Sequence, residues 1–224
     1  MGATVIHDVL VWLGDRAHYR GDDGVPHRLL VHLEVSGAAV GLACLVALPL
    51  AIVLGHRRSR LGSAVVTLSN ATRALPVFGV LILLAATSLG TTNKSAVLAL
   101  ALFAVPPLLT NAYVGVRGVD ADVVEAARGN GMSGLQVLRS VELPLAVPLI
   151  AAGLRTAAVQ VVATATLAAY VGGGGLGQFI YEGFGRGDAV ETAAGGVLVA
   201  ALALVTEGIL AVVQRTVTPR SASG

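Results

Sequence analysis

Charged residues are scarce in this chain, since Asp, Glu, Lys and Arg make up only 12% of its 224 residues. A soluble domain of this size has about 25%, so much of the charge that a water-exposed surface needs is missing. Hydrophobic residues make up 55% of the sequence, and its mean hydropathy is +0.80. Several apolar stretches reach the roughly 20 residues that cross a hydrocarbon core. The composition therefore predicts an all-α membrane protein.

Cysteine, clustered histidine and nucleotide-binding motifs are also lacking. Cys44 is the only cysteine and lies in an apolar run, which excludes a disulfide framework and a cysteine metal site. The five histidines are unclustered. No GxxxxGK[ST] motif occurs, so the chain has no P-loop of its own for ATP phosphates. We therefore expect no catalytic, cofactor or metal site in this chain.

Neither nucleic-acid binding nor a cleavable signal peptide is expected. The net charge is +2, but the basic residues are scattered, and the only cluster, at residues 56–60, follows an apolar run as a cytoplasmic membrane flank does. The first 28 residues contain four aspartates and no sustained apolar core. A short apolar patch at residues 5–13 carries Trp12 and predicts a helix at the membrane interface.

Five apolar segments are long enough to be membrane spans. The second is interrupted by Arg73 and Pro76, so we expect one helix over residues 61–72, a break, and a second helix over residues 74–89. Arg73 would then reach the interface and avoid the cost of a charge at the bilayer centre. The spans are expected at residues 29–55, 61–89, 96–116, 145–171 and 189–213.

The basic residues of the loops predict the orientation, because cytoplasmic loops carry the excess of Lys and Arg. Eight lie on one side and five on the other, which places the N-terminus outside and the C-terminus inside. We expect an external arm at residues 1–28, a transmembrane domain at 29–217 and a cytoplasmic tail at 218–224. The eight are Arg57, Arg58, Arg60, Arg117, Arg128, Arg139, Arg215 and Arg220, and the five are Arg16, Arg20, Arg28, Lys94 and Arg186.

The only long amphipathic segment, residues 125–144, lies in the expected cytoplasmic loop 117–145. We call it the island. A turn at residues 129–131 should join two short helices there, because Gly and Asn tolerate positive φ. Asp120 or Asp122 can cap the first helix, and Ser133 with Gln136 fits a capping box for the second.

The faces of the two island helices can also be predicted. Leu135, Leu138 and Val141 would share one face of the second helix, and Pro144 would end it and start the next membrane span. Glu125 would lie at a helix start, where it could serve a partner's cation or the helix dipole. Such a segment can rest on lipid headgroups or dock against a soluble partner.

The island sequence, EAARGNGMSGLQVLRSVELP, closely resembles the EAA signature of ABC-importer permeases. The pattern EAA, three residues, Gly, nine residues, Ile, one residue and Leu-Pro is met throughout, with Val141 in place of the usual isoleucine. In that family the loop carries a coupling helix that sits in a groove of the ATPase, and ATP and Mg²⁺ belong to that partner. The resemblance implies that the coupling residues are Glu125, Ala126, Ala127, Gly131, Val141, Leu143 and Pro144.

A glycine-rich loop at residues 172–188 contains a formal GxGxxG. It follows a membrane helix rather than a strand, so we reject a dinucleotide site. The string TLAAYVGGGGLGQFIYEGF at residues 166–184 resembles the external loop of osmoprotectant permeases, and ALPVFGVLILL at 74–84 is similar to another segment of that subfamily. Gly173 departs mildly from the usual alanine. The resemblance implies an outer gate or a contact with a binding protein at Gly172, Gly174, Gly175 and Gly177.

Thr156, Gln160 and Thr164 recur every four residues and share one helix face. They either line a translocation path, together with Arg73 and Pro76, or make hydrogen bonds between helices. Arg155 is expected to pair with Glu207, for which Arg73 is the other candidate partner. The spans show no aromatic cluster that could hold a quaternary ammonium, so we expect selectivity to reside in a separate binding protein.

Together these features are similar to a type I ABC importer permease of the methionine-permease-like kind, in a multi-pass arrangement in the cell membrane. The resemblance implies a permease dimer, identical or paired with a sister subunit, two ATPase subunits and an external substrate-binding protein. The implied cargo is a compatible solute such as glycine betaine, carnitine, choline or proline. A permease for another solute, such as an amino acid of the methionine kind, stays open. So do a secondary transporter or channel without an ATPase and an intramembrane enzyme, although no inverted repeat or catalytic set is evident.

Overall fold

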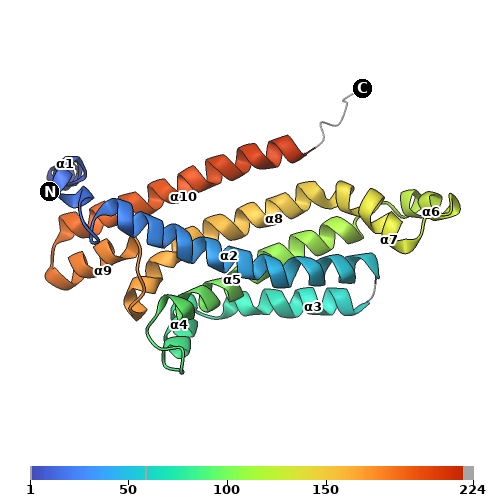
Figure 1. Cartoon of the computed structure of the whole chain (residues 1–224), viewed down its shortest axis with the longest axis horizontal. Helices are drawn as coiled ribbons and strands as arrows, with labels where there is room; N and C mark the ends of the chain where they lie inside the picture. The colour runs from blue at the N-terminus through green and yellow to red at the C-terminus, as the bar shows by residue number, and fades with distance from the viewer. Residues whose placement is uncertain (1, 59, 219–224) are drawn as a thin grey trace. The chain divides into compact units, whose positions relative to one another are not determined.

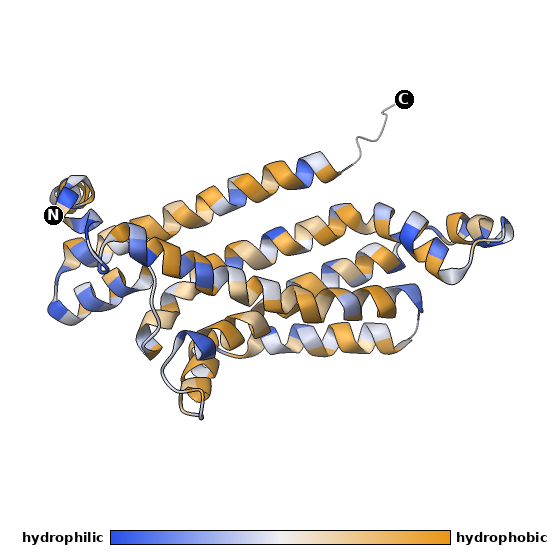
Figure 2. Ribbon diagram, viewed as in Figure 1, coloured by the Kyte–Doolittle hydropathy of each residue, from blue (hydrophilic) through white to orange (hydrophobic). Residues whose placement is uncertain are grey.

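The computed structural model describes residues 2–58 and 60–218, within which all regular secondary structure is helical (Figure 1). In this described part of the chain, four helices are long and apolar enough to cross a membrane, and the number of spans is five if the bent pair α3–α4 counts as one. Figure 2 shows the apolar character of the long helices. The predicted all-α bundle of about five spans is confirmed. The long helices are α2 (Val25–His56), α5 (Asn93–Arg117), α8 (Leu143–Thr164) and α10 (Ala189–Val217).

The N-terminal segment forms the helix that its apolar patch predicts, α1 (Gly2–Gly14). Asp15 ends it and caps a short 3-10 turn, η1 (Arg16–Tyr19), by accepting a hydrogen bond from the Ala17 amide. Trp12 packs against a small hydrophobic core, which fixes α1 to the start of α2 and to α9 (Gly177–Arg186). The buried members of that core are Val25, Leu176, Phe179 and Val199.

The second apolar segment breaks where predicted but is shorter beyond the break. α3 (Arg60–Ala71) and the 3-10 turn η2 (Thr72–Ala74) precede α4 (Val77–Ala85), and the two helical parts are bent by 85°. The bend lies at Leu75, which is extended because a following proline disfavours the helical conformation. The prediction that this helix continues to residue 89 was wrong. α4 ends at Ala85, a turn follows at Ala86, and the Thr87 hydroxyl donates to the Leu84 carbonyl.

Two compact units can be distinguished in the chain. Unit 1 comprises Met1–Gly41, Pro76–Leu102 and Ala158–Thr206, and unit 2 comprises Leu42–Leu75, Phe103–Ala157 and Glu207–Gly224. The tail expected at residues 218–224 lies outside the described residues except for Thr218, and Arg220 lies outside them as well.

Small residues allow close packing of helices inside unit 2. A Cβ on Gly62 of α3 would meet the Tyr113 ring of α5 at 2.4 Å. A Cβ on Gly153 of α8 would meet the Asn111 side chain of α5 at 2.7 Å. Helix α5 runs through Pro106 and Pro107 without interruption, and Asn111 Nδ2 donates to the Pro107 carbonyl. α5 is therefore in close contact with α3 and α8.

Candidate functional site

The two short helices that the island sequence predicts are present as α6 (Ala121–Gly129) and α7 (Gly134–Val137). Because α6 begins before residue 125 and Val119 packs with it, the island extends over residues 119–144 in the structure. Asp120 caps α6 by accepting a 2.9 Å hydrogen bond from the Asp122 amide. Ser133 and Gln136 make both hydrogen bonds of the predicted capping box. Gly131 has φ of +83°, a left-handed conformation that favours glycine and lets the chain turn between the helices.

The island has its own hydrophobic core inside unit 2. Its buried residues are Val119, Val124, Ala127 and Val137, against which Met132 and Val141 pack. Of the predicted face of Leu135, Leu138 and Val141, Val141 packs against this core, whereas Leu135 is exposed and its neighbour Val137 is fully buried. After one turn α7 passes into a π-helical segment, η3 (Leu138–Glu142), whose turn is wider than that of an α-helix.

The island is also continuous with the following membrane helix. The Leu143 amide donates to the Leu138 carbonyl, and α8 starts directly at Leu143. Pro144 starts the next membrane span as predicted, because it is the second residue of α8, but the chain stays helical from the π segment into that span. Gly134–Val171 thus behaves as one long helical element.

Two contacts within unit 2 hold the island to the end of α2. Nδ1 of His56 lies 2.5 Å from Oε2 of Glu142, whose side chain is buried. Nη2 of Arg58 donates to the Val119 carbonyl at 2.7 Å, and Arg58 itself adopts a positive φ of 48°. The basic cluster after the first long helix therefore includes two residues that contact the island directly.

The coupling residues implied by the sequence divide into exposed and packed groups. Glu125 and Ala126 are exposed on α6, whereas Ala127 is buried in the island core. Glu125 is the fifth residue of α6, so its expected place at a helix start was wrong, and Asp122 is the acidic residue of the first turn. Gly131 and Pro144 are exposed, and Val141 and Leu143 are partly buried.

The glycine-rich loop is packed tightly within unit 1. The Gly174 amide donates to Oδ1 of Asn93 at 2.9 Å, and Gly175 has φ of +112° beside His32. A Cβ on Gly177 would lie 2.2 Å from the Thr166 carbonyl oxygen. Gly172 is exposed, Gly174 is partly buried, and Gly175 and Gly177 are buried.

The polar residues of α8 bond mainly to their own helix. Thr156 is exposed and donates to the Ala152 carbonyl at 3.0 Å. Thr164 donates to the carbonyl of Gln160 at 2.7 Å, and both residues are partly buried. The contacts of these hydroxyl groups therefore do not require a neighbouring helix. Arg73 in η2 and Pro76, which precedes α4, are both exposed at the bend.

The predicted pair of Arg155 and Glu207 is present in unit 2. Nε of Arg155 donates to Oε1 of Glu207 at 2.8 Å, and Nη1 donates to Gln214 at 3.1 Å. Nη2 makes a further contact with the same carboxylate oxygen. Arg73 is not the partner of Glu207.

An aromatic cluster that sequence reasoning missed lies in unit 1. Phe78 and Tyr170 meet edge to face at 5.6 Å between ring centroids, and Tyr170 meets Tyr181 in the same way at 5.1 Å. All three rings are exposed to between 41% and 49%, so the other described residues of the chain do not cover them fully. The residues come from three separate segments, and no local sequence signal joins Phe78 to the other two.

Comparisons with known proteins agree on the class. Residues 47–220 match the family described as binding-protein-dependent transport system inner membrane component. The glycine betaine/carnitine/choline transport system permease protein of Bacillus subtilis (strain 168) is 38% identical over 193 residues, which are 86% of this chain and 88% of that one. The osmoprotectant import permease protein of Salmonella typhimurium is 32% identical over 213 residues, 92% of this chain and 98% of that one.

Solved structures confirm the expected fold. An inward-facing methionine ABC transporter matches with a TM-score of 0.77 at 20% identity, covering 87% of this chain and 96% of that one. At this identity the likeness concerns the fold alone. The resemblance to osmoprotectant permeases, drawn from the island and the glycine-rich loop, is confirmed by the relatives.

Proposed function

This chain belongs to the binding-protein-dependent transport system inner membrane component family, and from that premise we propose that it forms half of the passage through which an ATP-driven importer moves an osmoprotectant. The spans and the family make it a multi-pass protein of the cell membrane. The observation that carries the proposal is the island, a folded docking element with its own core, which presents Glu125 and Ala126 outward.

The proposed coupling path starts at an ATPase that contacts α6. Movement of the island would pass to α8, because the π segment joins the two without a break. It would also pass to α2 through the contact of His56 with Glu142. The excess of basic residues on this side supports a cytoplasmic island, an external N-terminus and an internal C-terminus. Two ATPase subunits and a second permease, identical or a sister, would complete the complex.

The proposed cargo is a quaternary amine such as glycine betaine, carnitine or choline, the solutes named for the 38% identical relatives. Aromatic ring faces attract such cations, and the cluster of Phe78, Tyr170 and Tyr181 offers three partly exposed rings. A cargo of the methionine kind is the alternative, and its support is limited to the fold that this chain shares with the methionine transporter.

An external binding protein would deliver the cargo near residues 172–188. The buried glycines determine the conformation of this loop. Exposed residues such as Gly172 and Phe184 would therefore make the direct contacts with the binding protein. Within the membrane, the path would be lined by Thr156, Gln160 and Thr164, with Arg73 and Pro76 at the bend. The three side chains of α8 are polar and uncharged, and both threonine hydroxyl groups bond to their own helix.

Reconstitution tests the proposal. The chain, its permease partner, the ATPase and the binding protein would be placed in proteoliposomes, and solute-stimulated ATP hydrolysis and uptake would be measured. We expect stimulation by glycine betaine, carnitine or choline and none by methionine. Uptake by the permease without the ATPase would contradict the class of transporter, and stimulation by methionine alone would contradict the cargo.

A further inference from the structure

A polar cavity of about 330 Å³ lies in unit 1, between the segment after α1, the start of α2 and helix α9. Small-molecule sites in proteins usually start at about this size. Three arginines and three carboxylates line it, together with the rings of His18 and Phe179. The charged members are Arg20, Asp23, Arg28, Glu182, Arg186 and Glu191.

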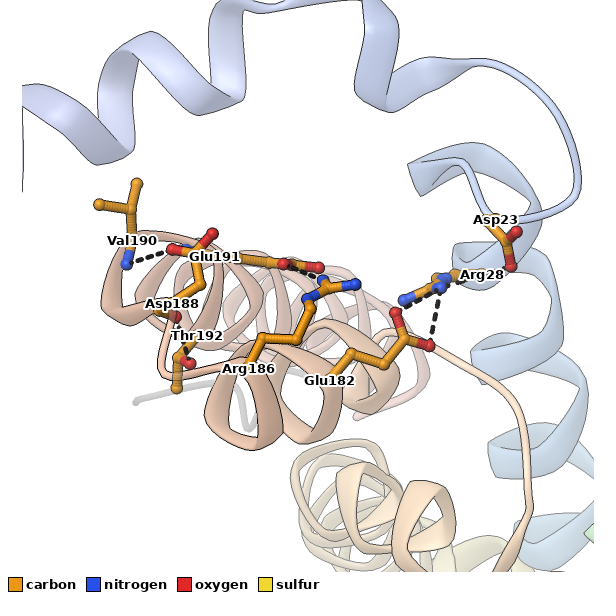
Figure 3. A network of polar contacts seen from close by, with 8 residues as sticks. All are labelled: Asp23, Arg28, Glu182, Arg186, Asp188, Val190, Glu191 and Thr192. Carbon is orange, nitrogen blue, oxygen red and sulfur yellow. Dashed lines mark hydrogen bonds and ion pairs between the residues drawn. The ribbon is translucent and has the colours of Figure 1, made fainter.

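Arg28 is the central residue of this cavity and is 4% exposed. Its Nη2 donates to both oxygens of Glu182 at 3.0 Å and reaches Asp23 at 3.4 Å. Figure 3 shows Arg28 and Glu182 pointing toward each other from α2 and α9. The guanidinium carbon stacks 4.3 Å from the centre of the Phe179 ring. Nε and Nη1 have no partner among the described residues, although both are buried.

Buried donors without partners cost free energy, so the two free nitrogens of Arg28 call for an acceptor. The nearby carboxylates are already engaged, since Arg28 holds Glu182 and Arg186 holds Glu191. That pairing with Glu191 also raises the pKa of Arg186. Arg20 is exposed at the rim and makes no ion pair within the described part of the chain. The cavity therefore has spare guanidinium donors on Arg28. Asp23 and Glu182 keep part of their carboxylate surface open to a cation, since their side chains are 95% and 34% exposed.

We propose that this cavity binds a small zwitterion, with its carboxylate on Arg28 and Arg20 and its cationic end toward Asp23 and Glu182. Arginine presents a planar pair of donors that matches a carboxylate. A multiply charged anion such as phosphate is disfavoured, because three carboxylates border the same space. The cavity lining shares no residue with the island or with Thr156, Gln160 and Thr164 of α8, and the inference does not need the proposed transport function to be correct.

Trp12 makes the proposal directly testable, because it is the only tryptophan of the chain. Its ring stacks on His18 at 4.0 Å and meets Phe179 edge to face at 5.3 Å, and both partners line the cavity. A ligand that enters should change the tryptophan emission. The purified full chain in detergent micelles would be titrated with glycine betaine, with choline, which lacks the carboxylate, and with inorganic phosphate.

We expect a saturable change of Trp12 emission with glycine betaine and none with choline or phosphate. Arg20→Gln should weaken binding about tenfold, since it removes a charge-assisted donor. Arg16→Gln, an exposed arginine of η1 outside the cavity lining, is the matched control and should bind like the native chain.

Arg28→Lys should abolish binding, with the Trp12 emission maximum of the free protein serving as a check on folding. If that variant does not fold, the affinity of Arg20→Gln for glycine betaine still tests the proposal. No saturable change with glycine betaine, an equal response to choline or phosphate, or unchanged binding by Arg20→Gln would each overturn the proposal.

Discussion

Glu142 and His56 are 86 residues apart in the sequence, yet Oε2 of Glu142 lies 2.5 Å from Nδ1 of His56. The Glu142 side chain is 1% exposed, and its Oε1 has no partner among the described residues. This contact joins the end of α2 to the π segment of the island. It is one of the two contacts that hold the proposed docking element to the end of the first long membrane helix.

Removal of His56 should destabilise the protein. His56→Ala leaves both oxygens of a buried carboxylate without a partner, which costs about 1–3 kcal/mol. We expect a lower midpoint of thermal unfolding. Unfolding can be monitored by the reaction of the partly buried Cys44 with a fluorogenic maleimide. Arg57→Ala is the control, because the neighbouring Arg57 is exposed. Equal midpoints for the two variants would show that the contact contributes nothing to stability.

The start of α9 should not accept a side chain. Gly177→Ala would place a Cβ 2.2 Å from the Thr166 carbonyl oxygen, and overpacking of this kind costs about 1–3 kcal/mol. Gly185→Ala in the same helix meets nothing within 4 Å and should be neutral or slightly stabilising. Thermal unfolding of both variants measures the difference. A Gly177→Ala protein as stable as Gly185→Ala would refute the tight packing of the loop.

The turn of the island should depend on one glycine and not on its neighbour. Gly131→Ala forces an alanine into a left-handed conformation at about 1–2 kcal/mol. Gly129 has no positive φ, and a Cβ added there would meet no atom within 4 Å, so Gly129→Ala should be tolerated. Amide hydrogen exchange of the segment from Ala126 to Gln136 should become faster only in Gly131→Ala. Equal exchange in both variants would argue against this turn geometry.

Arg155 and Glu207 should behave as a coupled pair. An unpaired charge within a span is costly, so Arg155→Met and Glu207→Gln should each lower the unfolding midpoint. The double variant should lose less than the sum of the two single variants, because neither partner is then left alone. Arg215→Gln, an exposed arginine of the same helix as Glu207, serves as the control. Additive losses would mean that the two side chains do not interact.

The elements that follow from local sequence signals could be predicted. The break at Pro76, the cap of Asp120 and the capping box of Ser133 each depend on residues within a few positions, and each is present in the structure. The pair of Arg155 and Glu207 could also be expected, because charges are rare in spans and few partners were available.

The features that sequence reasoning missed depend on tertiary packing. A π segment has no sequence signature, so the burial of Val137 and the passage through Pro144 could not be foreseen. The partner of His56 and the aromatic neighbours of Phe78 come from distant segments. The site of Arg28 likewise depends on distant residues, since its partners Glu182 and Phe179 both come from α9.

The most direct test of the account concerns the side of the membrane on which α6 lies and what covers it. Ala126→Cys would be introduced with Cys44→Ala, which removes the only native cysteine, and labelled with a membrane-impermeant maleimide. We predict labelling in inside-out vesicles, none in intact cells, and protection when the ATPase subunits are bound. Labelling from outside the cell, or labelling that the ATPase leaves unchanged, would contradict the proposal that the island couples ATP hydrolysis to transport.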